Sequence, residues 1–210
     1  MFVGRKQELA TLERLYRSGA FQMPVVYGRR RVGKTSLIAE FVKGKPVIFF
    51  SARESTAKEN LVALSQAIAD LRLDGTSVAS DTAAPVFASF EEAFTHVFTL
   101  AQQQRIVLVI DEFPYLAQSD RSVSSVLQHL IDHHKENSRL FLILCGSSMS
   151  FMEHQVLGYK SPLYGRRTAQ VKVQPFDIMQ ASLLLRGSSS EDIVTWYGIA
   201  GGIPLYLEQF

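Results

Sequence analysis

Short apolar runs alternate along the chain with longer segments whose apolar residues recur at helical spacing. Apolar runs predict strands at residues 23–27, 46–50, 105–110, 140–145 and 170–173. Helical spacing predicts helices at residues 5–18, 34–42, 61–71, 90–101 and 123–131, with further helical segments from residue 177 onward. This alternation is typical of an α/β fold in which helices cover both faces of a mainly parallel, five-stranded sheet. Such sheets bind ligands beyond the carboxyl ends of their strands.

Two features divide the chain. Residues 74–89 are rich in Gly, Pro, Ser and Thr and are predicted to form a loop. Residues 1–175 contain all the predicted strands, whereas 176–210 are predicted to begin a helical lid. Because the sequence stops inside the amphipathic segment GGIPLYLEQF, we expect this lid to be truncated and the parent polypeptide to be longer.

Composition narrows the class of protein. With 210 residues, 47% of them hydrophobic, the chain can bury one sizeable core. The net charge of +2 is well below that of a dedicated nucleic-acid clamp. The single cysteine, Cys145, excludes an internal disulfide framework and fits a reducing compartment. No signal-peptide or membrane-spanning stretch is present in the sequence, so we expect a cytoplasmic location and no membrane partner.

The segment GRRRVGKT matches the phosphate-loop pattern GxxxxGK[ST] and lies between a predicted strand and a predicted helix. Glycines let successive backbone N–H groups turn toward a phosphate, and the helix N-terminus adds its unpaired amides. Lys34 is expected to reach the β- and γ-phosphates and Thr35 to ligate Mg²⁺, while the helix turns Ser36 to another face. The expected nucleotide-binding residues of this loop are Gly28, Arg29, Arg30, Arg31, Val32, Gly33, Lys34, Thr35 and Ser36.

The three consecutive arginines, Arg29–Arg31, have two interpretations. Their charges can attract a nucleotide or a nucleic-acid partner. They can also be solvated charges at the variable positions of the loop, which is the interpretation we favour.

A second acidic motif, RIVLVIDE, delivers two adjacent carboxylates at the end of an apolar strand. Asp111 is expected to hold Mg²⁺ through its water shell, and Glu112 to act as the general base toward the attacking water. Together with the phosphate loop this pair predicts a P-loop NTPase fold, with three α/β/α layers, and a Mg²⁺-dependent hydrolase. ATP is favoured over GTP because no NKxD guanine-recognition element occurs around either asparagine, Asn60 or Asn137.

The ordered set of motifs resembles the archaeal-type ATPases, a branch of the AAA+/STAND P-loop group. The segments that carry the resemblance are MFVGRKQELATL, YGRRRVGKTSLI, VLVIDEFPYL, LCGSSMSFM, SPLYGRR and YGIAGGIPLYL. The resemblance implies that Phe2, Val3, Gly4 and Arg5 lie against the adenine of ATP or ADP. It also implies that the 201–204 segment, with Pro204, closes over the base.

Further roles follow only from the resemblance. Ser147 or Ser148 matches the position that senses the γ-phosphate, and Ser147 is the residue we select. Arg166 or Arg167 matches an arginine that neutralises transition-state charge in cis or from a neighbouring subunit, and Arg166 is selected. Family members usually continue into more of the lid, a winged-helix-like region and often a nuclease-like domain, so DNA is a further partner to consider.

Three functions therefore remain in view. The first is an ATPase that converts nucleotide state into movement of the terminal helices, with self-association as one means of supplying the arginine. The second is a nucleotide switch with slow turnover, and the third is the motor half of a DNA-acting protein. His129, His133 and His134, beside Asp132, have metal-ligand chemistry, but a polar helix surface is the better interpretation.

Overall fold

The computed structural model describes residues 2–71 and 86–210, so most of the predicted loop at 74–89 lies outside the described residues. Its strands are β1 (Pro24–Tyr27), β2 (Val47–Ser51), β3 (Ile106–Asp111), β4 (Leu140–Gly146) and β5 (Ala169–Lys172). They form one sheet in the order β2-β3-β4-β1-β5, and every pair is parallel. The predicted α/β fold with a parallel five-stranded sheet is confirmed.

Helices follow the strands and cover the sheet. In chain order they are α1 (Lys6–Arg17), α2 (Lys34–Phe41), α3 (Ala57–Ala69), α4 (Phe90–Gln103), α5 (Phe113–Ser119), α6 (Val123–His134), α7 (Met149–Phe151), a π-helical turn (Met152–Val156), α8 (Ile178–Ser182), α9 (Ser190–Ala200) and α10 (Pro204–Leu207). Helices α5 and α7 and the π-helical turn were not predicted from the sequence. Each is too short for a helical period to emerge, although Pro114 in the first turn of α5 is a helix-start signal.

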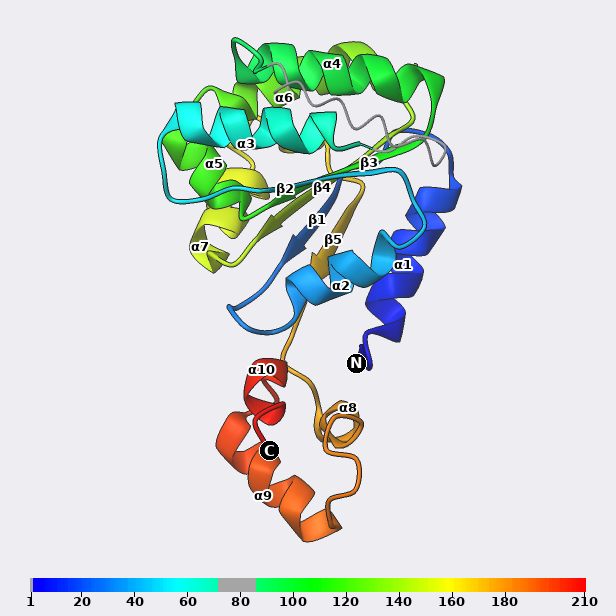
Figure 1. Cartoon of the computed structure of the whole chain (residues 1–210), viewed down its shortest axis with the longest axis vertical. Helices are drawn as coiled ribbons and strands as arrows, with labels where there is room; N and C mark the ends of the chain where they lie inside the picture. Colours follow the sequence, from blue (N-terminus) through cyan, green and yellow to red (C-terminus); the bar gives the residue numbers. More distant parts are fainter. Residues whose placement is uncertain (1, 72–85) are drawn as a thin grey trace.

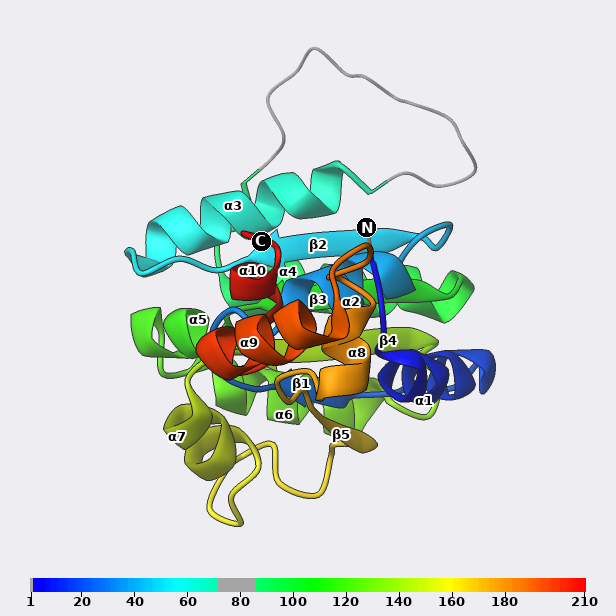
Figure 2. The same ribbon diagram turned by 90° about the horizontal axis from the view of Figure 1, so that it is seen from below.

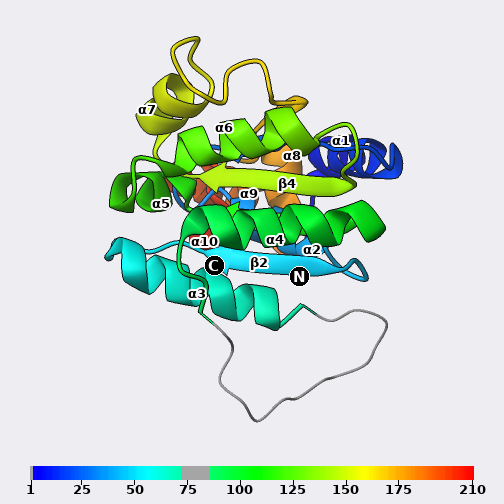
Figure 3. The same cartoon turned by 90° about the horizontal axis from the view of Figure 1, so that it is seen from above.

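Alternate residues of each strand face opposite sides of the sheet, and the two faces carry different helices. Ile106, Leu108 and Ile110 of β3 belong to a core that includes residues of α3, α4, α5 and α6. Val107 and Val109, between them, belong to a second core with residues of α1 and α2. Seen from above, α6, α4 and α3 run alongside one another, with β4 and β2 visible between them (Figure 3). This is the three-layer arrangement expected from the alternation of strands and helices.

The chain after β5 forms a separate helical layer. Helices α8, α9 and α10 lie beyond the end of the sheet to which β5 leads, at the opposite end of the molecule from α4 (Figures 1 and 2). They bury a small core of their own, made of Phe176, Ala181, Leu185, Ala200 and Leu207. We call residues 176–210 the lid segment, and their definition as a separate domain remains a prediction.

The lid segment is closed on itself by a tight backbone contact. Phe176 N–H donates to the Gly202 carbonyl at 2.7 Å. A Cβ atom at Gly202 would lie 2.1 Å from the Phe176 carbonyl oxygen, and the residue has φ +72°. Only glycine fits there, because both the left-handed backbone and the close approach exclude a side chain.

Within residues 2–71 and 86–210 no helix combines the length and the apolar character that crossing a bilayer requires.

Candidate active site

The phosphate loop connects β1 to α2 and is shaped by glycine. A Cβ atom at Gly28 would lie 2.3 Å from the carbonyl oxygen of Val173, so the loop passes this strand end too closely for a side chain. Helix α2 then begins at Lys34 after Gly33, with no side-chain cap and no acidic residue in its first turn. The first amides of α2 are therefore free to meet an anion, and no nearby carboxylate of that turn opposes it.

Lys34 and Thr35, the first two residues of α2, have different hydrogen-bond partners. Lys34 is only 6% exposed, and its ammonium donates to the carbonyls of Gly28 at 3.1 Å and Arg29 at 2.9 Å. The Thr35 hydroxyl donates to Oδ2 of Asp111 at 3.0 Å, and Asp111 is itself buried. The structure thus brings the P-loop hydroxyl and the carboxylate that ends β3 together, as the two motifs predict.

Glu112 follows Asp111 in a left-handed conformation, with φ 51° and ψ 46°. This conformation is uncommon outside glycine and costs about 1–3 kcal/mol when the surroundings enforce it. Oε2 of Glu112 accepts hydrogen bonds from the amide of Ser147 at 3.2 Å and from its hydroxyl at 3.0 Å. Because β3 and β4 are paired neighbours, the residues that follow them meet at one edge of the sheet. Strain and two fixed donors together aim the Glu112 carboxylate.

Of the two candidate sensor serines, the structure brings Ser147 to Glu112. Ser148 precedes α7 and is exposed. Behind them, burial raises the pKa of the Cys145 thiol, and the adjacent negative charge of Asp111 raises it further. Cys145 is therefore a protonated core residue under the site and not a nucleophile in it.

Two cavities adjoin at the phosphate loop. The first, which we call the phosphate cavity, has a volume of about 360 Å³. It is lined by Arg30, Arg31, Gly33, Lys34, Thr35, Ser36, Glu112, Ser147, Pro204, Leu205 and Glu208. Lys34, Thr35, Glu112 and Ser147, predicted from separate motifs, share this one cavity.

The second, the base cavity, has a volume of about 350 Å³ and a more apolar wall. Its lining residues are Phe2, Val3, Arg5, Val32, Gly33, Ser36, Ala39, Glu40, Lys43, Phe176, Leu184, Pro204 and Glu208. Of the segment expected against adenine, Phe2, Val3 and Arg5 line this cavity, whereas Gly4 lines a neighbouring hollow. A cavity walled by Phe2, Phe176 and Pro204 is suited to a flat aromatic ring.

Arg5 fixes the amino-terminal segment to the rest of the site. Its side chain is 3% exposed, and one guanidinium nitrogen donates to the carbonyls of Val32 at 2.9 Å and Gln174 at 2.6 Å. The guanidinium carbon also lies 4.4 Å from the ring centroid of Phe176 in the lid segment. Burial lowers the pKa of Arg5 from its usual value, and the ion pair with Glu8 at 3.2 Å partly offsets this effect. Arg5 therefore ties the base cavity to both the phosphate loop and the lid.

The three loop arginines are exposed, but two of them have defined partners. Arg30 donates to the hydroxyl of Tyr115 on α5 at 2.8 Å. Arg31 has φ 68° and donates to the hydroxyl of Tyr206 on α10 at 2.7 Å. The loop is thereby bonded to the lid segment directly. No local signal indicated the contributions of Tyr115, Tyr206, Phe176 and Glu208, because only the fold brings these distant residues to the loop.

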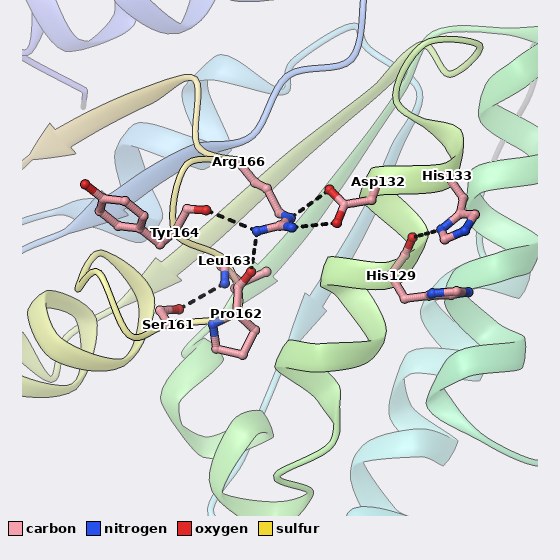
Figure 4. A network of polar contacts seen from close by, with 8 residues as sticks. All are labelled: His129, Asp132, His133, Ser161, Pro162, Leu163, Tyr164 and Arg166. Atoms are coloured by element: carbon pink, nitrogen blue, oxygen red, sulfur yellow. Dashed lines mark hydrogen bonds and ion pairs between the residues drawn. The ribbon is translucent and has the colours of Figure 1, made fainter.

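The structure does not bring Arg166 or Arg167 to the phosphate cavity. Arg166 pairs with Asp132 on α6, with Nε 2.9 Å from Oδ1 and Nη2 2.5 Å from Oδ2, and Nη1 donates to the Pro162 carbonyl at 2.7 Å (Figure 4). The hydrogen bond from Arg166 lowers the pKa of Asp132. Arg167 donates to the Leu157 carbonyl at 3.2 Å.

The histidines of α6 lie beside this ion pair. Nδ1 of His133 is 2.8 Å from the carbonyl oxygen of His129, and both residues are exposed (Figure 4). Within residues 2–71 and 86–210, no three His, Cys, Asp or Glu side chains are grouped so as to hold a metal ion. These positions form part of a helix surface.

The family of the chain is decided by comparison with known proteins. Residues 2–210 match a family described as an ATPase domain found predominantly in Archaea. The chain belongs to this ATPase family. An uncharacterized protein of Methanocaldococcus jannaschii is 34% identical over 209 residues, which is 100% of this chain and 44% of that protein. The chain thus spans less than half the length of this relative.

Solved structures share the fold. A Walker-type ATPase of Pyrococcus abyssi superimposes with a TM-score of 0.73 at 24% identity, over 99% of this chain and 66% of that one. The ORC2 protein of Aeropyrum pernix, solved in ADPNP–ADP complexes, gives a TM-score of 0.60 at 18% identity over 86% of this chain and 50% of that one. At these identities the likeness supports the fold of this ATPase domain and not the details of its site.

Proposed function

We propose that this domain binds ATP with Mg²⁺ across the two cavities, hydrolyses it, and couples nucleotide state to the position of the lid segment. The observation that carries the proposal is the shared phosphate cavity. It gathers Lys34, Thr35, Glu112 and Ser147, and Asp111 lies 3.0 Å from the hydroxyl of Thr35. Binding of ADPNP and ADP by the Aeropyrum pernix ORC2 protein supports the choice of an adenine nucleotide.

The oxygen atoms of Thr35 and Asp111 fit Mg²⁺. This ion prefers one or two protein oxygens together with phosphate oxygens and water, so one hydroxyl and one carboxylate suffice. When bound, Mg²⁺ supplies charge neutralisation at the phosphates. Lys34 supplies a second positive charge from within the loop, after exchanging its loop carbonyls for phosphate oxygens.

The contacts of Glu112 support its proposed role in activating water. The amide and the hydroxyl of Ser147 both donate to Oε2 of Glu112. The other carboxylate oxygen, Oε1, can therefore accept a hydrogen bond from a water molecule in the phosphate cavity. In the proposed reaction Glu112 takes the proton as the water oxygen bonds to the γ-phosphorus. The bond from that phosphorus to the β–γ bridging oxygen breaks, and its electron pair leaves with ADP.

Movement would reach the lid through contacts that begin at the phosphate loop. Arg31 bonds to Tyr206, Arg5 bonds to Val32 and stacks on Phe176, and a Cβ atom on Gly33 would lie 3.9 Å from Pro204. A nucleotide entering between the loop and Pro204 must displace or tighten these contacts. The lid position therefore depends on what the cavities hold.

Glu112→Gln tests the hydrolytic part of this proposal. Glutamine keeps an oxygen that can accept from Ser147 but is not a base at neutral pH. We expect nucleotide affinity to stay within about twofold and turnover to fall by about 10²- to 10⁴-fold. Turnover is measured with Mg²⁺-ATP across protein concentrations, and wild-type turnover in the variant would refute the role of Glu112.

A slow nucleotide switch is the second candidate, and the arginines favour it. Arg166 is engaged with Asp132, and Arg30 and Arg31 are bonded to tyrosines. A specific rate that rises with protein concentration would indicate an arginine supplied by a neighbouring copy. Stoichiometric bound nucleotide with negligible turnover at every concentration would establish the switch.

A further inference from the structure

The base cavity and the phosphate cavity share a short wall. Four residues line both cavities: Gly33 and Ser36 from the phosphate loop and α2, and Pro204 and Glu208 from the lid segment. The loop and the lid approach closely here, since a Cβ atom on Gly33 would lie 3.9 Å from Cγ of Pro204. A molecule that fills both cavities therefore lies against these four residues.

If the proposed function holds, the part of the nucleotide that crosses this wall is its ribose. The phosphates are held at the α2 N-terminus in one cavity, and the base lies in the more apolar cavity. The sugar joins the two. Gly33 and Pro204 have no side-chain hydrogen-bonding group, and Ser36 is in the first turn of α2, next to the phosphates. Glu208 is thus the polar side chain of the shared wall that lies on the lid side.

The second carboxylate near the base cavity is already paired. Glu40 lines the base cavity but not the phosphate cavity, and its carboxylate forms an ion pair with Lys43 at 2.5 Å. Glu208 is an exposed residue whose backbone N–H donates to the Pro204 carbonyl at 3.0 Å, which places it at the end of α10. In the described part of the chain its carboxylate makes no hydrogen bond or ion pair. It is therefore available to a ligand.

We propose that the carboxylate of Glu208 accepts a hydrogen bond from a ribose hydroxyl, so that the site binds ADP more tightly than the deoxy analogue that lacks this hydroxyl. A carboxylate is an acceptor only, and a sugar hydroxyl is a donor that the deoxy analogue lacks. A hydrogen bond to a charged acceptor is worth enough to change affinity by about tenfold. Because Glu208 belongs to the lid, this contact also favours the closed lid when a ribonucleotide is bound.

The experiment compares ADP, 2′-deoxyADP and 3′-deoxyADP by isothermal titration calorimetry, since diphosphates avoid turnover. At least one deoxy analogue should bind about tenfold more weakly than ADP to the wild-type chain. Glu208→Ala should weaken ADP about tenfold and remove the difference between the nucleotides, while Glu208→Gln should keep part of it. Glu191→Ala, which removes a carboxylate from α9 away from both cavities, should behave as the wild type.

Three results would overturn this proposal alone. Equal binding of all three nucleotides by the wild type would remove the ribose contact while leaving nucleotide binding itself intact. Tighter binding of every nucleotide by Glu208→Ala would show that the carboxylate acts by repelling phosphate. A preference for ADP that survives in Glu208→Ala would place ribose recognition elsewhere. No binding of ADP or ATP by the wild type would instead refute the proposed function, and this inference with it.

Discussion

Replacing Arg5 with alanine removes one buried guanidinium from the junction of three segments. The carbonyls of Val32 and Gln174 lose the donor that lies 2.9 Å and 2.6 Å away, and Glu8 loses its partner. The ring of Phe176 loses the cation 4.4 Å from its centroid. Arg5 would then no longer join the phosphate loop, the segment that follows β5 and the lid.

The expected loss of stability follows from these contacts. Each carbonyl left without a donor costs about 1–3 kcal/mol, and the cation–π contact adds about 0.5–1 kcal/mol. We expect Arg5→Ala to lower the free energy of unfolding by about 3–5 kcal/mol. For a chain of this length that corresponds to a melting temperature lower by roughly 6–20 °C. Arg5→Lys should lose about half as much, because an ammonium keeps the charge but lacks the planar fork that reaches all of these partners at once.

Denaturant titration followed by circular dichroism measures this change, with Arg14→Ala as the matched control. Arg14 is exposed on α1, the helix that follows Arg5, and its removal should change the free energy of unfolding by less than about 0.5 kcal/mol. If Arg5→Ala matched Arg14→Ala to within about 1 kcal/mol, Arg5 would not be holding these segments together.

Two other perturbations have defined expectations. In denaturant titration, Gly202→Ala should destabilise the lid by at least about 2 kcal/mol more than Gly201→Ala does. Both glycines have φ above +50°, but only a Cβ atom at Gly202 would clash with Phe176. Equal losses of stability in the two variants would contradict this contact. Arg166 lowers the pKa of Asp132 in the folded state. The ion pair therefore stabilises the fold at pH values above about 4, the pKa of this carboxyl in the unfolded chain. This stabilisation is lost as the pH falls through the lower pKa that Asp132 has in the folded state. Carboxyl NMR titration should show that pKa rising in Arg166→Ala, and an unchanged value would mean that the pair does not form in solution.

The local sequence was informative wherever a short stretch carried its own physical signal. Apolar runs located all five strands to within one or two residues, because buried parallel strands need continuous apolar side chains. The phosphate-loop glycines and the two acids at the end of β3 were readable for a similar reason, since the chemistry they suit requires particular residues at fixed spacing. Helices α5 and α7 were missed because one or two turns give no detectable period.

No local sequence pattern predicts the contacts between segments that are far apart along the chain. Nothing near Arg166 in the sequence indicates that Asp132 on α6 takes up its guanidinium. In the same way, the bond from Arg31 to Tyr206 joins residues separated by most of the chain. Their meeting depends on how β5 and the lid return to the phosphate loop.

The sequence by itself therefore determined the class of fold, the ATPase family and the residues suited to phosphate and metal chemistry. Only the tertiary structure decided that Ser147 aims Glu112, that Arg5 joins loop and lid, and that Glu208 lies on the wall between two cavities. The physical reason is that backbone geometry and local chemistry are encoded over a few residues. Shared walls and cross-chain hydrogen bonds arise from packing elements that are far apart along the chain.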